Sequence, residues 1–195
     1  MSRRMLVLAS TSPRRISLLK QLGISFEAVD PGDAENSVSV EPVAHVREHA
    51  ISKAEAVAVK YPDRLVIAAD TIVVLDGRIL EKPRSREEAK IMLRALCGRT
   101  HKVISAVALI EKDKKRSDIR TEETRVTMKR LNEEEIEAYV ATGEPMDKAG
   151  AYAAQGVGAI IIERVEGCFY NVVGLPMSLL YEMLKEAGVN PLTSQ

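Results

Sequence analysis

The sequence has few aromatic side chains and no excess charge of either sign. Phenylalanine, tryptophan and tyrosine together make up 4% of its 195 residues. No stretch interleaves aromatic with basic residues, the combination with which proteins stack on RNA and neutralise it. Lys plus Arg and Asp plus Glu both number 28, so the formal net charge is zero. No overall field draws the chain to nucleic acid or to an anionic membrane, and any anion site has to be local.

Long apolar runs and paired cysteines are lacking as well. No apolar run approaches the roughly 18 residues of a transmembrane candidate. The start, "MSRRMLVLAS", has a basic flank, but its apolar stretch is too short for a signal peptide. Cys97 and Cys168 form no C-x-x-C pair, which favours two buried free thiols over a disulfide. We therefore expect a cytoplasmic protein that does not span a membrane.

The remaining composition is that of a globular protein with one sizeable core. Hydrophobic residues make up 46% of the chain, and we expect a single domain over residues 1–195. Apolar patterns and turn signals predict strands at 4–10, 24–30, 64–75, 101–113 and 116–130, and helices at 12–22, 42–60, 85–98, 132–143 and 176–187. Strands and helices mix without strict alternation, which favours an α/β or α+β fold with a mixed sheet.

The segment "LASTSPRR" joins the first predicted strand to a helix that should begin at Ser12. A helix N-terminus carries about half a positive charge and free N–H groups, which favour a phosphate or a carboxylate. Arg14 and Arg15 oppose this dipole, and a bound anion would offset the repulsion while accepting from their planar guanidinium groups. Ser10 adds a hydroxyl group. The segment indicates either an anion site or a solvated helix start.

Asp70 interrupts an apolar strand in "AADTIVV". A buried, unpaired carboxylate is costly, so Asp70 should lie at a strand edge, pair with a cation or bind a metal. An Asp-Gly hairpin follows and brings back Lys82 in "EKP", which we expect to be the partner cation. Further carboxylates lie in the loop after the second predicted strand: Asp30, Asp33 and Glu35. One or two of them with Asp70 would suit Mg²⁺, whereas a salt bridge at a strand end explains Asp70 equally well.

Two other segments carry residues with possible chemistry. "HVREH" fits the H-x-x-E-H pattern of inverted zincins, with His45 and His49 as zinc ligands and Glu48 as base. The polar face of an amphipathic helix explains the same pattern. "DKAGAYAAQGVGA" is rich in glycine, which allows close approach to a ligand, and Gln155 has an amide that can read a base edge. A tight turn is the alternative there.

Taken in order along the chain, these segments resemble the Maf family of nucleoside triphosphate pyrophosphatases. The matching segments are "LASTSPRR", "ISKA", "AADTIVVLDG", "EKPRSREEA", "GRTHKVISAVAL", "EPMDKAGAYAAQGVGA" and "VVGLP", which span about residues 6–177. Each segment alone is moderately specific, and the ordered set is highly specific. The resemblance covers nearly the whole chain.

The resemblance implies an α/β fold, with a long mixed β-sheet, flanking helices and two lobes around a central cleft, as in Maf and ITPase-like proteins. It implies hydrolysis of nucleoside triphosphates to the monophosphate and pyrophosphate with a divalent cation, Mg²⁺ or Mn²⁺. It also implies a homodimer, a nucleotide rather than nucleic acid or a membrane as partner, and a possible role in cell-division arrest.

The resemblance assigns roles to individual residues. Asp70 matches the proton acceptor, and Glu35 matches an acid near the metal. The residues that match the phosphate cleft are Ser10, Arg15, Lys53 and Lys82, and we count Lys53 and Lys82 with Asp70 as catalytic. The residues that match the positions separating two branches of the family are Arg14, Thr71 and Gln155.

At these three positions, the branch that acts on dTTP and UTP has "SPRR", "ADT" and "QG", as this chain does. A sister branch acting on 7-methyl-GTP has "SPWR", "SDQ" and "EG". We therefore expect a dTTP/UTP pyrophosphatase, with modified pyrimidine nucleotides as further possible substrates. Two alternatives are a regulatory module that binds nucleotides without turnover and an H-x-x-E-H zinc peptidase.

Overall fold

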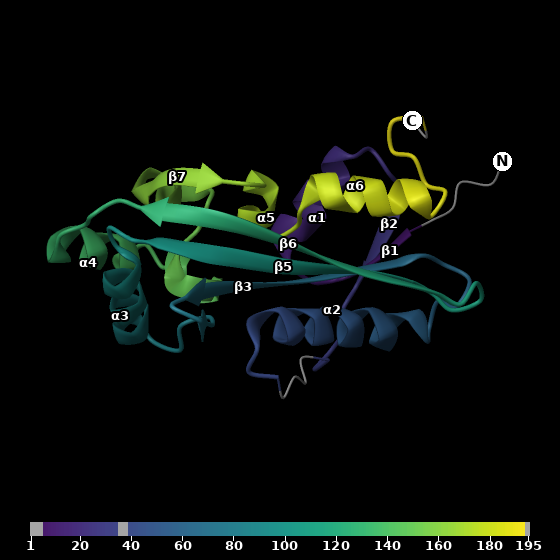
Figure 1. The fold of residues 1–195 in the computed structure, drawn as a ribbon, viewed down its shortest axis with the longest axis horizontal. Helices are drawn as coiled ribbons and strands as arrows, with labels where there is room; N and C mark the ends of the chain where they lie inside the picture. The colour runs from purple at the N-terminus through teal and green to yellow at the C-terminus, as the bar shows by residue number, and fades with distance from the viewer. Residues whose placement is uncertain (1–5, 35–38, 194–195) are drawn as a thin grey trace. The chain divides into compact units, whose positions relative to one another are not determined.

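The structure, a computed structural model, describes residues 6–34 and 39–193 of the chain (Figure 1). Over these residues, seven strands form one mixed sheet in the order β2-β1-β3-β5-β6-β7, with β4 paired to β3. The strands are β1 (Leu6–Ala9), β2 (Phe26–Val29), β3 (Val66–Leu75), β4 (Arg78–Leu80), β5 (Thr100–Glu111), β6 (Arg116–Met128) and β7 (Ile162–Glu166). The helices are α1 (Pro13–Gln21), α2 (Pro42–Ala58), α3 (Arg86–Leu96), α4 (Glu133–Ala141), α5 (Phe169–Val173) and α6 (Met177–Glu186). The predicted mixed α/β architecture is confirmed.

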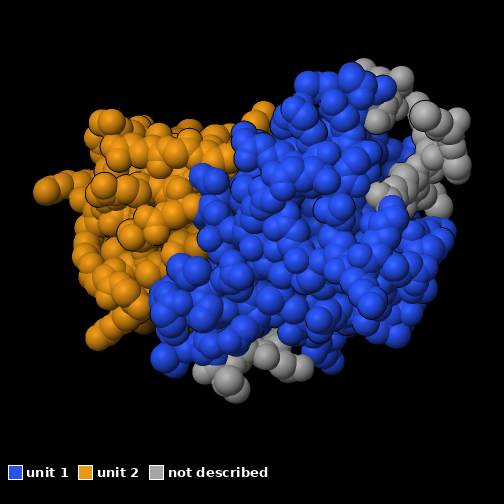
Figure 2. All heavy atoms as spheres, turned by 45° about the vertical axis from the view of Figure 1, so that its right-hand side comes forward, with its two compact units in different colours: residues 1–70, 105–122, 174–195 blue, residues 71–104, 123–173 orange. Residues whose placement is uncertain are grey.

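The chain divides into two compact units, each assembled from separate stretches of sequence (Figure 2). Unit 1 comprises residues 1–70, 105–122 and 174–195, and unit 2 comprises residues 71–104 and 123–173. The boundary in β3 falls between Asp70 and Thr71. The single domain over residues 1–195 and the central cleft stay predictions.

Unit 1 is built on the parallel strands β1, β2 and the first half of β3. Strand β1 is buried along its whole length, which explains its uninterrupted apolar sequence, because a parallel strand is covered on both faces. Helix α2 lies on one face of this part of the sheet, and α1 and α6 lie on the other (Figure 1). Each helix buries an apolar stripe, formed by Leu18 and Leu19 in α1, by Val46, Ala50 and Val57 in α2, and by Leu180, Met183 and Leu184 in α6.

Unit 2 contains elements whose ends the sequence marks clearly. Strands β3 and β4 form the predicted hairpin, with Asp76 and Gly77 both at positive φ, as a type I′ turn requires. Helix α3 begins after Ser85, whose hydroxyl accepts from a backbone N–H in the first turn. Helix α4 begins with the predicted capping box between Asn132 and Glu135. The apolar faces of both helices pack into one core with β3, β5 and β6.

Three short 3₁₀ turns follow α4, where the sequence indicated only a turn or close backbone approach. They are η1 (Glu144–Asp147), η2 (Ala149–Ala151) and η3 (Gly156–Ile161). Gly150, in η2, has a positive φ of 70° and a Cβ there would lie 3.0 Å from the side chain of Val73, so η2 lies tightly against β3. The N–H of Gly150 also donates to the carbonyl of Glu81, at 3.1 Å.

The sequence predicts no membrane span and two free cysteine thiols. Within the described ranges, the structure has no helix long and apolar enough to cross a bilayer. Cys97 and Cys168 are free thiols, as predicted, but both are half-buried rather than buried.

Candidate active site

The carboxyl end of β1 and the middle of β3 bring together the first residues of the site. The two strands are parallel, with Val7 opposite Val66 and Leu8 opposite Ile67. Ser10 directly follows β1, and Asp70 lies three residues beyond Ile67 in β3, so both lie toward the same edge of the sheet. Ser10 and Asp70 are 6% and 7% exposed. In open α/β sheets, ligands bind at this carboxyl edge.

Asp70 is held by two side chains of α2. The ammonium of Lys53 donates to Oδ1 at 2.7 Å, and Nδ1 of His49 lies 3.4 Å from Oδ2. His49 and Lys53 are four residues apart, so they lie on the same face of the helix. Lys53 is 6% exposed, and the pair is therefore almost fully withdrawn from water. Both oxygens of this carboxylate have partners.

The charge of Asp70 is set by a balance between burial and its cationic surroundings. Burial alone would raise the pKa of Asp70, because it removes water from the charged form. The hydrogen bond from His49 and the positive charges of Lys53 and Arg15 act in the opposite direction and outweigh burial. The pKa of Asp70 therefore lies well below its ordinary range, and the carboxylate is ionised at neutral pH.

The sequence did not indicate His49 as a partner of Asp70, and Lys82 was the expected partner cation. The structure gives Lys53 instead, and Lys82 has an exposed side chain in unit 2. Lys82 was expected because it follows the Asp76–Gly77 hairpin, which returns the chain toward Asp70. The spacing of four residues between His49 and Lys53 places both side chains on one helix face. The sequence does not show that this face packs on β3 next to Asp70.

Among the residues that the structure describes, the H-x-x-E-H segment has no partner set for the metal site that the peptidase alternative requires. His45 and His49 lie on one face of α2, with ring centroids 4.2 Å apart. However, Nδ1 of His45 bonds the carbonyl of Ser39 at 3.1 Å, and the carboxylate of Glu48 accepts from the hydroxyl of Ser39. In residues 6–34 and 39–193, no group of three or more His, Cys, Asp or Glu side chains could hold a metal ion.

The serine and arginine residues of "STSPRR" lie in the turn after β1 and in the first turn of α1. The hydroxyl of Ser10 accepts from the N–H of Ser12 at 3.1 Å, which fixes the turn between β1 and the helix. Arg15 donates through Nε to the carbonyl of Gly174 at 2.8 Å, and its charge acts on Asp70. Arg14 is half-buried in the first helical turn. Ser10, Arg15, Lys53 and Asp70 thus all belong to unit 1, whereas Lys82, which the sequence predicts in the same phosphate cleft as Ser10, Arg15 and Lys53, belongs to unit 2. Their binding roles stay predictions.

The family of the chain follows from comparison with known proteins. The family model described as Maf-like protein matches residues 5–187, and β1, α1, α2 and β3 with the residues above all lie within this range. The chain belongs to the Maf-like protein family.

Curated relatives of this Maf-like protein cover nearly its whole length. A dTTP/UTP pyrophosphatase of Pelotomaculum thermopropionicum is 52% identical over 188 residues, which are 96% of this chain and 98% of the relative. A dTTP/UTP pyrophosphatase of Dictyoglomus thermophilum is 46% identical over 189 residues, again 96% and 98% of the two chains.

Solved structures support the fold of the Maf-like protein. A HAM1 protein from Coxiella burnetii has a TM-score of 0.54 at 16% identity and covers 93% of this chain and 98% of its own. The Staphylococcus aureus Ham1 protein has a TM-score of 0.53 at 17% identity and covers 94% and 99%. At this identity the likeness concerns the fold alone.

Three predicted site residues of the Maf-like protein lie in unit 2. Thr71 is half-buried in β3, Lys82 is exposed after β4, and Gln155 is exposed directly before η3. The bond from Gly150 to Glu81 joins the segment of Gln155 to the segment of Lys82. Their binding roles stay predictions. Glu35, the predicted metal ligand, lies outside the described residues.

Asp70 is the buried carboxylate of this site that a divalent metal could use. Mg²⁺ is commonly bound through one or two carboxylates together with substrate phosphates. Asp70 is suited to be one of these carboxylates. Its oxygens are bonded to Lys53 and His49, so the described residues do not hold a metal by themselves. Asp70 would become a ligand only with phosphate oxygens beside it.

Proposed function

We propose that this Maf-like protein is a nucleoside triphosphate pyrophosphatase that hydrolyses dTTP and UTP to the monophosphate and pyrophosphate. The observation that carries the proposal is the buried carboxylate of Asp70, bonded to Lys53 and placed in β3 just beyond the carboxyl end of the neighbouring parallel strand β1. The name of the relatives, which are about half identical over nearly the full chain, supports the same activity.

The proposed reaction is attack of water on the α-phosphorus. The water oxygen forms a bond to phosphorus, the α–β anhydride bond breaks, and pyrophosphate leaves. Asp70 orients this water and accepts its proton, a role worth about 10²- to 10⁴-fold in rate. The N–H groups at the start of α1, with Ser10 and Arg15, bind phosphate oxygens. Lys53 stabilises the charge that develops on the leaving group. The family resemblance is the basis for proposing Lys82 in the same role.

The ion pair with Lys53 gives Asp70 a means of activation. A carboxylate whose pKa lies far below neutrality is a weak base. A triphosphate is a stronger competitor for an ammonium group than a single carboxylate, and it would draw Lys53 toward its own oxygens. Loss of this ammonium would raise the pKa of Asp70, whereas a divalent cation bound to the same carboxylate would lower it, so these two opposing effects set the strength of Asp70 as a base while the substrate is bound.

Base selection in this proposal belongs to Arg14, Thr71 and Gln155. The amide of Gln155 offers one donor and one acceptor, which complements the carbonyl and N–H edge shared by thymine and uracil. Gln155 is exposed, as a group that contacts the substrate must be. A site built on such paired polar groups discriminates strongly, because the wrong base leaves them unpaired.

The metal and the assembly complete the proposal. The divalent cation would be Mg²⁺ or Mn²⁺, bound chiefly through the phosphates, with Asp70 and Glu35 as protein ligands. Its chemistry would be to neutralise charge on the leaving pyrophosphate. We also propose a cytoplasmic homodimer and leave a role in division arrest as a hypothesis.

A nucleotide panel tests the function. The purified protein is incubated with Mg²⁺ or Mn²⁺ and with dTTP, UTP, CTP, ATP, GTP or 7-methyl-GTP, and pyrophosphate release is measured. We expect release from dTTP and UTP to exceed that from the purine nucleotides. Binding of dTTP in calorimetry without release of product would instead favour the regulatory-module alternative.

A further inference from the structure

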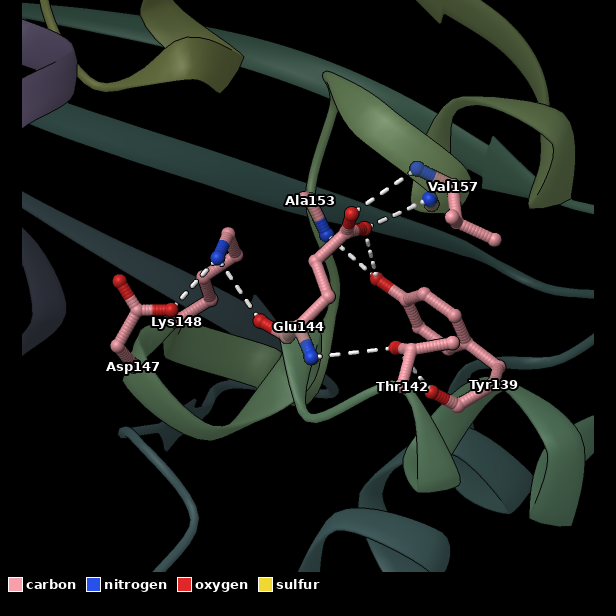
Figure 3. Close-up of polar contacts among 8 residues, drawn as sticks. Tyr139, Thr142, Glu144, Asp147, Lys148, Ala153 and Val157 are labelled. Atoms are coloured by element: carbon pink, nitrogen blue, oxygen red, sulfur yellow. Dashed lines mark hydrogen bonds and ion pairs between the residues drawn. The ribbon is translucent and has the colours of Figure 1, made fainter.

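A second carboxylate, that of Glu144, lies at the centre of a hydrogen-bond network in unit 2. Its Oε1 accepts from the hydroxyl of Tyr139 at 2.9 Å and from the N–H of Gly158 at 2.7 Å. Its Oε2 accepts from the N–H of Val157 at 2.9 Å. Figure 3 shows this carboxylate between the ring of Tyr139, in α4, and the backbone at the start of η3. One side chain therefore joins a helix to a turn.

The network extends to the other end of the same loop through Tyr139. Its hydroxyl oxygen accepts from the N–H of Ala153 at 3.1 Å while its proton goes to Glu144. The main chain of Glu144 is fixed in turn, because the ammonium of Lys148 donates to its carbonyl at 2.8 Å and its N–H donates to the hydroxyl of Thr142 at 3.2 Å (Figure 3). The loop 153–158 is thus bonded at both ends to one phenol–carboxylate pair.

Two glycines allow the backbone to approach this pair closely. A Cβ on Gly156 would lie 2.3 Å from Oε2 of Glu144, and Gly156 has a φ of 77° that disfavours other residues. A Cβ on Gly158 would lie 2.5 Å from the hydroxyl of Tyr139 and 2.4 Å from the carbonyl of Ala153. These distances are far below van der Waals contact, so a side chain at either position would displace the Tyr139–Glu144 pair or the loop.

The residue held between the two bonded ends is Gln155. Its backbone is extended, with φ −124° and ψ 161°, and its side chain is exposed. Ala153 is bonded two residues before it and Val157 two residues after it. The position and direction of the Gln155 side chain therefore depend on bonds to Tyr139 and Glu144.

We propose that Glu144, acting with Tyr139, is the positioning residue that aims Gln155 at the nucleobase and so sets base selectivity. This inference rests on the proposed function. A carboxylate suits the task because it only accepts hydrogen bonds, and three donors converge on it. A glutamine in its place would direct an NH₂ group at one of these donors, which loses a bond and adds repulsion.

The decisive variant is Glu144→Gln, which keeps the size of the side chain. We expect the ratio of kcat/KM for dTTP over GTP to fall about tenfold, through a higher KM for dTTP, with kcat changed much less. Gln155→Ala should lower the same ratio by a similar factor. Glu134→Gln is the matched control, since it makes the same chemical change at an exposed residue of α4, and it should keep the wild-type ratio.

Hydrogen exchange supplies a readout that does not depend on activity. The amides of Val157 and Gly158 should exchange faster in Glu144→Gln than in wild type, while those of β5 keep their protection. Faster exchange with an unchanged selectivity ratio would overturn the proposal, because the loop would then be freed without effect on base choice. Unchanged exchange would overturn it as well.

Tyr139→Phe gives a second, independent test should Glu144→Gln fold poorly. It removes the hydroxyl but keeps the ring, and we expect a smaller fall of the selectivity ratio in the same direction. The double variant should lose less than the sum of the two single effects, because both act on one loop. Additive effects would contradict a shared positioning role.

An error in the proposed function can be distinguished from an error in the role of Glu144. If wild-type protein releases no pyrophosphate from any nucleotide, the proposed function is wrong. Calorimetry with dTTP and GTP then replaces kinetics, and the role of Glu144 is overturned if Glu144→Gln binds both nucleotides with wild-type affinities.

Discussion

Asp70 and Glu144 are carboxylates with several hydrogen-bond donors each, but the donors differ in kind. Asp70, in unit 1, is bonded to an ammonium and an imidazole and lies in the field of Arg15. Glu144, in unit 2, is bonded to two backbone N–H groups and a phenol. Burial opposes the charge in both cases, and in both the hydrogen bonds bring the pKa below its ordinary value.

The difference in donors indicates different roles. A cationic side chain such as Lys53 can turn toward another anion, so the environment of Asp70 can change when a phosphate arrives. Backbone N–H groups cannot leave Glu144 unless the loop itself moves. We infer that Asp70 is suited to chemistry and Glu144 to holding a conformation, and the variants below test this contrast between the two units.

The largest effect is expected for Asp70→Asn. The substitution keeps the shape of the side chain but removes the charge and the base, so kcat should fall about 10²- to 10⁴-fold. Asp76→Asn is the matched control, because Asp76 is exposed in the β3–β4 turn and asparagine tolerates its positive φ. Steady-state pyrophosphate release measures both. Turnover by Asp70→Asn at the wild-type rate would exclude Asp70 as the reactive group.

Lys53→Met should damage both stability and activity. Removing one partner of a buried ion pair costs about 3–5 kcal/mol, because the other charge stays buried. The lowered pKa of Asp70 gives stability that is present above its ordinary value of 3.8 and is lost as the pH falls through the folded-state value. In Lys53→Met this acid dependence should shrink.

Urea unfolding at several pH values measures the effect of Lys53→Met, and Lys60→Met is the control. Lys60 is exposed just beyond α2, so its removal should cost almost nothing. Equal losses of stability in the two variants would show that the pair with Asp70 contributes nothing.

Substitution of His101, a buried residue of unit 2, should change the stability of the protein but not its activity, unlike substitution of Asp70 or Lys53 in unit 1. It is 2% exposed, with Nε2 2.7 Å from the hydroxyl of Tyr152, and burial lowers its pKa to about 4 from 6.5. Between these values the unfolded chain binds more protons than the folded one, so stability should fall by roughly 3 kcal/mol as the pH drops from 7 to 4. In His101→Phe this contribution should vanish, with kcat at pH 7 unchanged. An acid dependence identical to that of wild type in urea unfolding would refute the assignment.

Asn132→Ala should have the smallest effect. It removes the hydrogen bond from the N–H of Glu135 to the Asn132 side chain, at 2.9 Å, and so breaks the capping box of α4. We expect a loss of about 1 kcal/mol in stability and no change in kcat. Thermal unfolding measures the loss. A change in nucleotide selectivity would mean that the start of α4 also controls the Tyr139–Glu144 network.

Much of the fold was predictable because its signals are local. The turn of Asp76 and Gly77 and the caps at Ser85 and Asn132 each depend on residues within one turn of the chain. A tight turn was one of two expectations for residues 147–159, but the three separate 3₁₀ turns and the short helix α5 were not predicted. They have too few residues to show a period, and small side chains in the turns leave no apolar pattern.

The site was predictable only in part. Its residues could be named through the family resemblance, but their partners depend on which helix face meets which strand. For this reason Lys82 was expected as the partner of Asp70, and His49 was expected on the polar face of a helix, with a zinc motif as the alternative. Glu144 was overlooked because a single acid before a proline has no special pattern. Gly156 and Gly158 were noticed, but the carboxylate that requires them was not.

The bond between Arg15 and Gly174 has a consequence for the synthesis of the protein. It joins residues 159 positions apart, and unit 1 draws on both the first and the last stretches of the chain. Domains generally form in order as they leave the ribosome, at about 5–20 residues per second. Unit 1 can complete its core only when α6 has emerged, so the nascent chain has to carry β1 and α1 unfinished for most of translation. Truncated products that end before Gly174 would therefore lack the bond that holds Arg15, even where they retain every residue from Ser10 to Asp70.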